Sequence, residues 1–95
     1  MDKIEVQNIG QPGKTTRVDA AKSAEMRRAV LLVTPSEAPG LTPAEIIAAV
    51  KPHLSATLFP GGKTVGWWVK CVQLDLEAKG VMKRGPKAPV RVWQS

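Results

Sequence analysis

A Gly-Gly-Lys-Thr segment at residues 61–64 could do chemistry, because it matches half of a phosphate-binding loop. Such a loop needs a glycine, four residues and then Gly-Lys-Ser/Thr, so that backbone N–H groups surround the phosphates and the lysine reaches the terminal one. The first glycine belongs at position 57, where the sequence has Thr57. The segment before it also contains a proline and does not resemble a buried strand. We therefore expect no nucleotide site, and predict a turn that starts a helix with Thr64 as its N-cap.

Other catalytic arrangements lack their residues. His53 is the only histidine and Cys71 the only cysteine, so the sequence offers no metal-ligand set and no Ser-His-Asp or Cys-His pair. No carboxylate pair suggests acid–base chemistry. The sequence therefore predicts no metal, no cofactor and no enzyme. A single cysteine excludes an internal disulfide, and no apolar run approaches the roughly 18 residues of a membrane span. With no signal peptide at the N-terminus, we expect a cytoplasmic protein without a membrane partner.

The positive charge is concentrated in the second half of the chain. Residues 1–47 contain six basic and six acidic side chains, whereas residues 48–95 contain eight basic and only two acidic ones, Asp75 and Glu77. An excess of this kind indicates a polyanionic partner, most often nucleic acid, or serves solubility alone. Charge by itself leaves both interpretations open.

Three helices are predicted within one domain of residues 18–95. The first begins at Asp19, an N-cap before strong helix formers, and ends before Pro35. The second begins at Thr42, which starts a capping box with Glu45. The third runs from Val65 to a glycine cap at Gly80. At 100° per residue its main apolar arc should face the core; this arc holds Val65, Trp68, Val69, Val72 and Leu76.

The rest of the third helix has a second apolar arc and one polar strip. The second arc contains Trp67, Cys71, Leu74 and Ala78, so we expect Trp67 to pack in the core, with a dimer contact or a base-stacking surface as alternatives. The strip contains Gly66, Lys70, Gln73 and Glu77 and should face solvent. Residues 1–17 should form an N-terminal arm, in which residues 4–9 either pair as a short strand or stay loose.

After the third helix, residues 81–84 and 90–93 predict a two-stranded ribbon with a basic tip. The element order is helix, helix, helix, strand, strand, which is mainly α with a small β-ribbon, an α+β class. From Asp19 to Trp93 this order resembles the winged helix-turn-helix fold, and Leu41 lies where that fold often has a short strand that joins the ribbon. Residues 65–85 also resemble the N-terminal domain of Mrr-type restriction endonucleases, through Gly66-Trp67, Leu74 and Gly80. Residues 13–22 are similar to the opening of a small bacterial family of uncharacterised proteins.

The resemblance implies a protein that binds double-stranded DNA, a bacterial or phage regulator of transcription. Its third helix would enter the major groove and its ribbon would follow the phosphates. The implied recognition-helix residues are Lys63, Thr64, Lys70 and Gln73; the implied wing residues are Lys83, Arg84, Lys87 and Arg91; further backbone contacts are Lys14 and Arg17.

Winged helices also bind proteins, and some are purely structural. The alternative is therefore a protein–protein interaction module that uses Trp67, the N-terminal arm and the C-terminal strand. Trp93 either closes the ribbon over the core or lies in an interface. A homodimer is compatible with the DNA-binding hypothesis, because one such domain offers only a small DNA interface.

Overall fold

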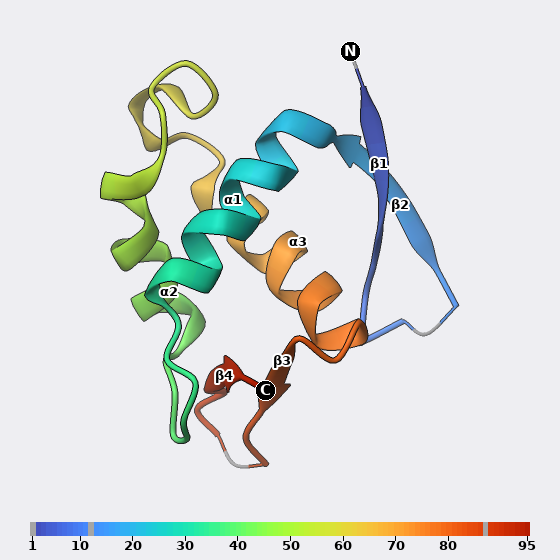
Figure 1. Ribbon diagram of the computed structural model, residues 1–95, viewed down its shortest axis with the longest axis vertical. Coiled ribbons are helices and arrows are strands. Elements are labelled where there is room, and N and C mark those ends of the chain that lie inside the picture. Colours follow the sequence, from blue (N-terminus) through green and yellow to red (C-terminus); the bar gives the residue numbers. More distant parts are fainter. Residues whose placement is uncertain (1, 12, 87) are drawn as a thin grey trace.

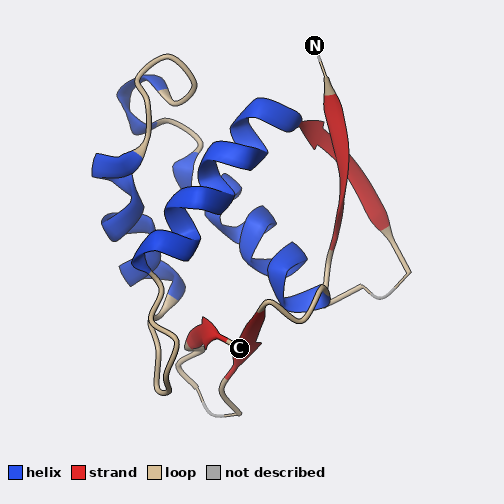
Figure 2. Ribbon diagram, viewed as in Figure 1, coloured by secondary structure: helices blue, strands red, loops and turns tan. Residues whose placement is uncertain are grey.

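The described residues form three α-helices and two small antiparallel sheets, which confirms the predicted α+β class (Figures 1 and 2). The computed structural model describes residues 2–11, 13–86 and 88–95. The elements are, in order, β1 (Lys3–Gln7), β2 (Thr15–Asp19), α1 (Ala20–Val33), α2 (Pro43–Val50), the 3₁₀ turns Lys51–His53 and Pro60–Gly62, α3 (Val65–Ala78), β3 (Met82–Arg84) and β4 (Val92–Gln94). None of the described helices is long and apolar enough to cross a membrane.

Local sequence signals set the starts of the first two helices. The Asp19 side chain accepts a hydrogen bond from the Lys22 N–H at 2.9 Å and caps α1. Thr42 and Glu45 form the predicted capping box at the start of α2. Thr64 lies at the N-cap position of α3, but its φ of 63° turns the side chain away, and the hydroxyl donates to the carbonyl of Lys63 instead. The predicted side-chain cap at Thr64 is therefore wrong.

The core lies where the three helices meet. The predicted main arc of α3 is buried, and it packs against α1 and α2. Met26 and Val30 of α1 and Ile46 of α2 are fully buried in this core. Trp68 meets Phe59 edge to face, with ring centroids 6.3 Å apart. Burying the apolar stripes of three helices on one another stabilises helices that would be marginal alone.

The N-terminal residues form a hairpin on the side of α3 that the other helices leave open (Figure 1). β1 pairs antiparallel with β2, and Val6 and Val18 join the core. The Gln7 N–H also donates to Asp75 Oδ1 at 2.7 Å. Residues 3–7 are thus a strand rather than a loose arm, and the boundary predicted between residues 17 and 18 falls inside β2.

The ribbon follows α3 directly and folds back beside its C-terminal end (Figure 1). β3 pairs antiparallel with β4, and Leu41 adds the expected third segment by pairing with Val92. Gly40 makes this approach possible: its φ is +77°, and a Cβ there would stand 2.0 Å from the Val92 carbonyl oxygen. At the C-terminal end of the sheet, the Gln94 amide donates to the carbonyls of Leu31 and Thr34. The last strand therefore completes the sheet and also provides hydrogen-bond donors for carbonyls at the C-terminal end of α1.

Candidate nucleic-acid interface

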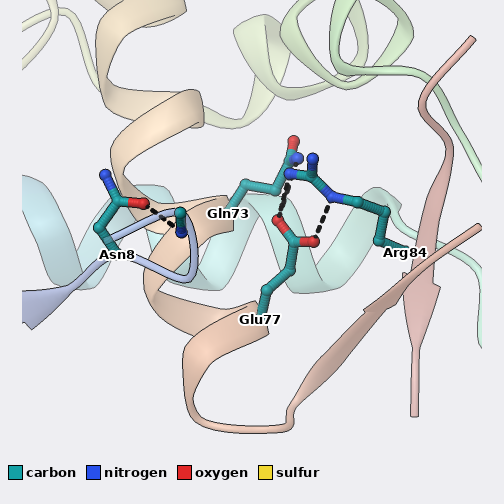
Figure 3. A network of polar contacts seen from close by, with 5 residues as sticks. Asn8, Gln73, Glu77 and Arg84 are labelled. Atoms are coloured by element: carbon teal, nitrogen blue, oxygen red, sulfur yellow. Dashed lines mark hydrogen bonds and ion pairs between the residues drawn. The ribbon is translucent and has the colours of Figure 1, made fainter. Parts of the chain in front are cut away.

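Both acidic side chains of the basic half are paired inside the protein. Asp75 Oδ2 accepts from Lys79 Nζ at 2.8 Å, one turn along α3. Glu77 accepts two hydrogen bonds from Arg84, from Nε at 2.7 Å and from Nη2 at 3.0 Å (Figure 3). This two-bonded geometry is the one in which a guanidinium holds a carboxylate best. The pairing also raises the pKa of Arg84, chiefly through its hydrogen bonds to Glu77.

The polar strip predicted to face solvent is buried along the C-terminal half of α3. Gln73 is 3% exposed and the Glu77 side chain 4%. The reason is the ribbon, which brings Arg84 over this part of the helix, so that its guanidinium meets Glu77 where water was expected. Gln73 Nε2 lies 3.4 Å from Glu77 Oε2 in the same cluster. The expectation that Gln73 points outward to reach a base is therefore wrong.

The remaining predicted residues of the third-helix region are exposed. Lys63 and Thr64 lie just before α3, and Lys70 lies in its second turn. Lys83 is exposed on β3. None of these three lysines makes an ion pair with a described residue. Among the predicted contacts of α3 and the ribbon, the exposed lysines without a described ion-pair partner are therefore Lys63, Lys70 and Lys83, which we call the free lysines.

The other predicted wing residues differ in their surroundings. Arg91 is half-buried; its Nη1 lies 3.3 Å from the Gly40 carbonyl and 3.4 Å from Glu45 Oε1. Hydrogen bonds from Thr42 lower the pKa of Glu45, and the positive charge of Arg91 adds to this. Arg91 thus braces the turn between α1 and α2 against the ribbon. Lys87 lies outside the described residues.

The two predicted contacts in the N-terminal segment lie on the hairpin. Lys14 and Arg17 are both exposed. Lys14 lines a hollow with Ala78, at the C-terminal end of α3. Lys63 lies before Val65, at the N-terminal end of the same helix. The ends of a 14-residue helix are about 20 Å apart. The structure therefore does not bring Lys14 together with Lys63.

Two of the hollows beside α3 border the predicted contact residue Lys70. The first, the hairpin hollow, has a volume of about 250 Å³ and lies between α3 and the hairpin, lined among others by Val6, Trp67, Lys70 and Cys71. The second, the ribbon groove, has a volume of about 340 Å³ and lies between α2, α3 and the ribbon; its lining includes Ile47, Gly66, Lys70, Gln73, Arg84 and Val90. Lys70 lines both, so it stands on the ridge between them.

Trp67 departs most from its predicted place. The residue is 57% exposed, although it lines the hairpin hollow together with Val6 and Thr16. Its ring meets that of Trp68 edge to face at 5.1 Å. Cys71, one turn further, is half-buried, and burial together with the negative charge of Asp75 raises the pKa of its thiol. Core packing is therefore the wrong prediction for Trp67.

Nothing in the described ranges supplies a metal site. Across residues 2–11, 13–86 and 88–95, no three His, Cys, Asp or Glu side chains lie together so that they could hold an ion. His53 is exposed, and its carbonyl accepts a hydrogen bond from Arg28 Nη2 at 3.0 Å.

The sequence interpretation missed the ion pair of Glu77 with Arg84 and the exposure of Trp67. A signal for the first exists: an acid in the last turn of a mainly apolar helix, followed seven residues later by an arginine in a strand that must fold back. No comparable signal exists for Trp67, since its exposure depends on how the hairpin packs against α3.

Comparison with family models gives one match, to "Family of unknown function (DUF6958)", over residues 3–92. Comparison with curated proteins and with solved structures gives no significant match. The family model spans the hairpin, all three helices and the ribbon up to Val92. The chain therefore belongs to the DUF6958 family.

Proposed function

We propose that the protein is a small, non-enzymatic DNA-binding protein of the winged helix-turn-helix type. In this proposal α3 lies in the major groove of double-stranded DNA with its N-terminal half inward, and the basic ribbon follows the phosphate backbone. The Leu41–Val92 pair supports the winged-helix comparison, because it adds a third segment to the ribbon at the position that the fold leads us to expect.

The observation that carries the proposal is the division of charges on α3 and the ribbon. The acids Asp75 and Glu77 are neutralised by their own partners, whereas the free lysines have none among the residues that the structure describes. An uncompensated set of exposed cations beside a helix attracts phosphates and releases counterions when they bind. The proposal uses Lys63 and Lys70 at the helix and Lys83 at the ribbon; Gln73 and Arg84 no longer serve as primary contacts.

The test is fluorescence anisotropy of a labelled random-sequence duplex, titrated with the protein at two salt concentrations. Three phosphate contacts give a slope of about −2.7 in log affinity against log salt, so affinity should fall about fortyfold from about 50 to about 200 mM salt. Replacing the free lysines (Lys63→Ala, Lys70→Ala and Lys83→Ala together) should abolish most of this slope.

A matched control removes the same number of charges elsewhere. Lys3→Ala, Lys22→Ala and Arg27→Ala, on β1 and α1, lower the net charge equally but belong to neither α3 nor the ribbon. The control variant should keep the wild-type slope. Equal losses in both triple variants would refute a defined DNA face, and absence of binding at low salt would refute the DNA proposal altogether.

A second candidate function is a protein-interaction module, favoured by the exposed indole of Trp67 beside the hairpin hollow. Large aromatic side chains of this kind often anchor protein interfaces. This function predicts that the wild-type protein binds no DNA or other polyanion. It also predicts that a Trp67→Gln variant no longer captures the protein partner.

A further inference from the structure

The ribbon groove combines an apolar floor with charged and polar groups at its edge. Ile47 from α2 and Val90 from the ribbon contribute the apolar surface, together with Val69 and Leu74 of α3. Lys70 and Arg84 add positive charge to the lining. The volume of about 340 Å³ lies at the lower end of the range of small-molecule sites.

One polar atom in the wall of this groove has no partner. Gln73 Oε1 is buried and accepts no hydrogen bond from any described residue. A buried, unpaired acceptor is destabilising, because it has lost its bonds to water and gained none. A donor from a water molecule or from a ligand would satisfy this atom.

The neighbours of Gln73 keep this oxygen unpaired. Its Nε2 faces Glu77 Oε2, and Glu77 in turn holds Arg84 with both oxygens. Turning the amide over would place Oε1 against the carboxylate, where two acceptors repel each other. In Figure 3 the Gln73 oxygen points away from Glu77. The cluster therefore engages the amide nitrogen and leaves the buried oxygen unpaired.

We propose that the ribbon groove binds a small carboxylic acid with an apolar body and a hydroxyl or amino group. The apolar body would lie on Ile47 and Val90, the hydroxyl or amino group would donate to Gln73 Oε1, and the carboxylate would meet Lys70. This binding mode requires a rotation about the last side-chain bond of Gln73, whose preferred angles are broad, to turn the buried oxygen toward the groove. This site does not depend on DNA binding and is tested without DNA.

The experiment is a titration of the full chain with three probes, followed through its backbone amide NMR signals. The probes are 3-hydroxybenzoate and 4-hydroxybenzoate, which carry a donor, and benzoate, which does not. Molecules of this size bind with millimolar dissociation constants in a suitable site. We expect shifts at Gly66, Val69, Lys70 and Gln73, and at least one hydroxybenzoate should bind about fivefold more tightly than benzoate because of the added hydrogen bond.

Two variants assign the contacts. Gln73→Met keeps the side-chain volume but removes the acceptor, so the advantage of the hydroxybenzoate should vanish while benzoate binding stays unchanged. Lys70→Gln should weaken all three probes several-fold, whereas Lys83→Gln, which removes an exposed lysine outside the groove lining, should change none of them. If Gln73→Met does not fold, the two lysine variants still test the site.

The proposal fails if all three probes leave the groove signals unshifted at millimolar concentration. It also fails if benzoate binds as tightly as both hydroxybenzoates, or if the shifts cluster at Trp67 and Cys71 in the hairpin hollow. Failure of this site leaves the DNA titration unaffected, and failure of DNA binding leaves this site unaffected.

Discussion

Replacing Arg84 with alanine tests whether the Glu77–Arg84 pair holds the ribbon on α3. The change leaves a carboxylate that is 4% exposed without its two hydrogen bonds. Removing one partner of a fully buried pair costs about 3–5 kcal/mol. Since the Arg84 side chain is 41% exposed and water can enter where it stood, we expect about 2–3 kcal/mol. For a domain of this size the melting temperature should fall by about 10–20 °C.

Urea unfolding followed by far-UV circular dichroism measures the effect. The matched control is Lys83→Ala, an exposed neighbour on the same strand without an ion pair, which should change the free energy of unfolding by less than about 0.5 kcal/mol. The double variant Glu77→Gln with Arg84→Ala should be more stable than Arg84→Ala alone, because no bare carboxylate remains. A loss below about 0.5 kcal/mol in Arg84→Ala, or no recovery in the double variant, would refute the reasoning.

Two further changes test the Gly40 turn and the Cys71 thiol. Gly40→Ala should lower the free energy of unfolding in urea by about 3–4 kcal/mol, because φ is positive and a Cβ would disrupt the two backbone hydrogen bonds between Leu41 and Val92. Its control is Gly61→Ala, which also has a positive φ but open space around the Cβ and should lower the free energy of unfolding by only about 1–2 kcal/mol. Iodoacetamide should alkylate Cys71 more slowly than free cysteine at about pH 8, and its rate should keep rising above the ordinary pKa of 9.0, because only the thiolate reacts.

The outcomes that would contradict these expectations are specific. Equal destabilisation by the two glycine variants would mean that the approach of residue 40 to the ribbon is not tight. A Cys71 alkylation rate that already reaches its plateau below pH 9 would contradict the raised pKa. Guanidinium-unfolded protein serves as the control, since unfolding should restore the rate of an ordinary thiol.

Much of the fold could be predicted from local sequence signals. The capping residues Asp19 and Thr42 start α1 and α2 as expected, and Gly80 follows α3 with a φ of +76°. The main arc of α3 was predictable because helical periodicity depends only on spacing. The paired segment at Leu41 was expected from the winged-helix resemblance, and it is present.

The parts that could not be predicted depend on contacts between distant segments. Helical spacing distinguishes polar from apolar faces, but it does not say that a later strand will place an arginine over Gln73 and Glu77. Trp67 and Cys71 lie on one arc, but one is exposed and the other half-buried, a difference that helical spacing does not encode. The excess of basic residues in the second half of the chain was therefore predictable, but the prediction that the polar strip of α3 faces solvent was wrong.

The bonds from Gln94 to the end of α1 have a consequence for how the chain is made. The carbonyls of Leu31 and Thr34 receive their donor from a residue 63 and 60 positions later. At about 5–20 residues per second, the ribosome needs roughly 3–12 s to synthesise that interval. Throughout that time the last turn of α1 lacks its partner, and the ribbon lacks its second strand. The helices can begin to associate during translation, but the fold closes only after residue 94 has left the ribosome.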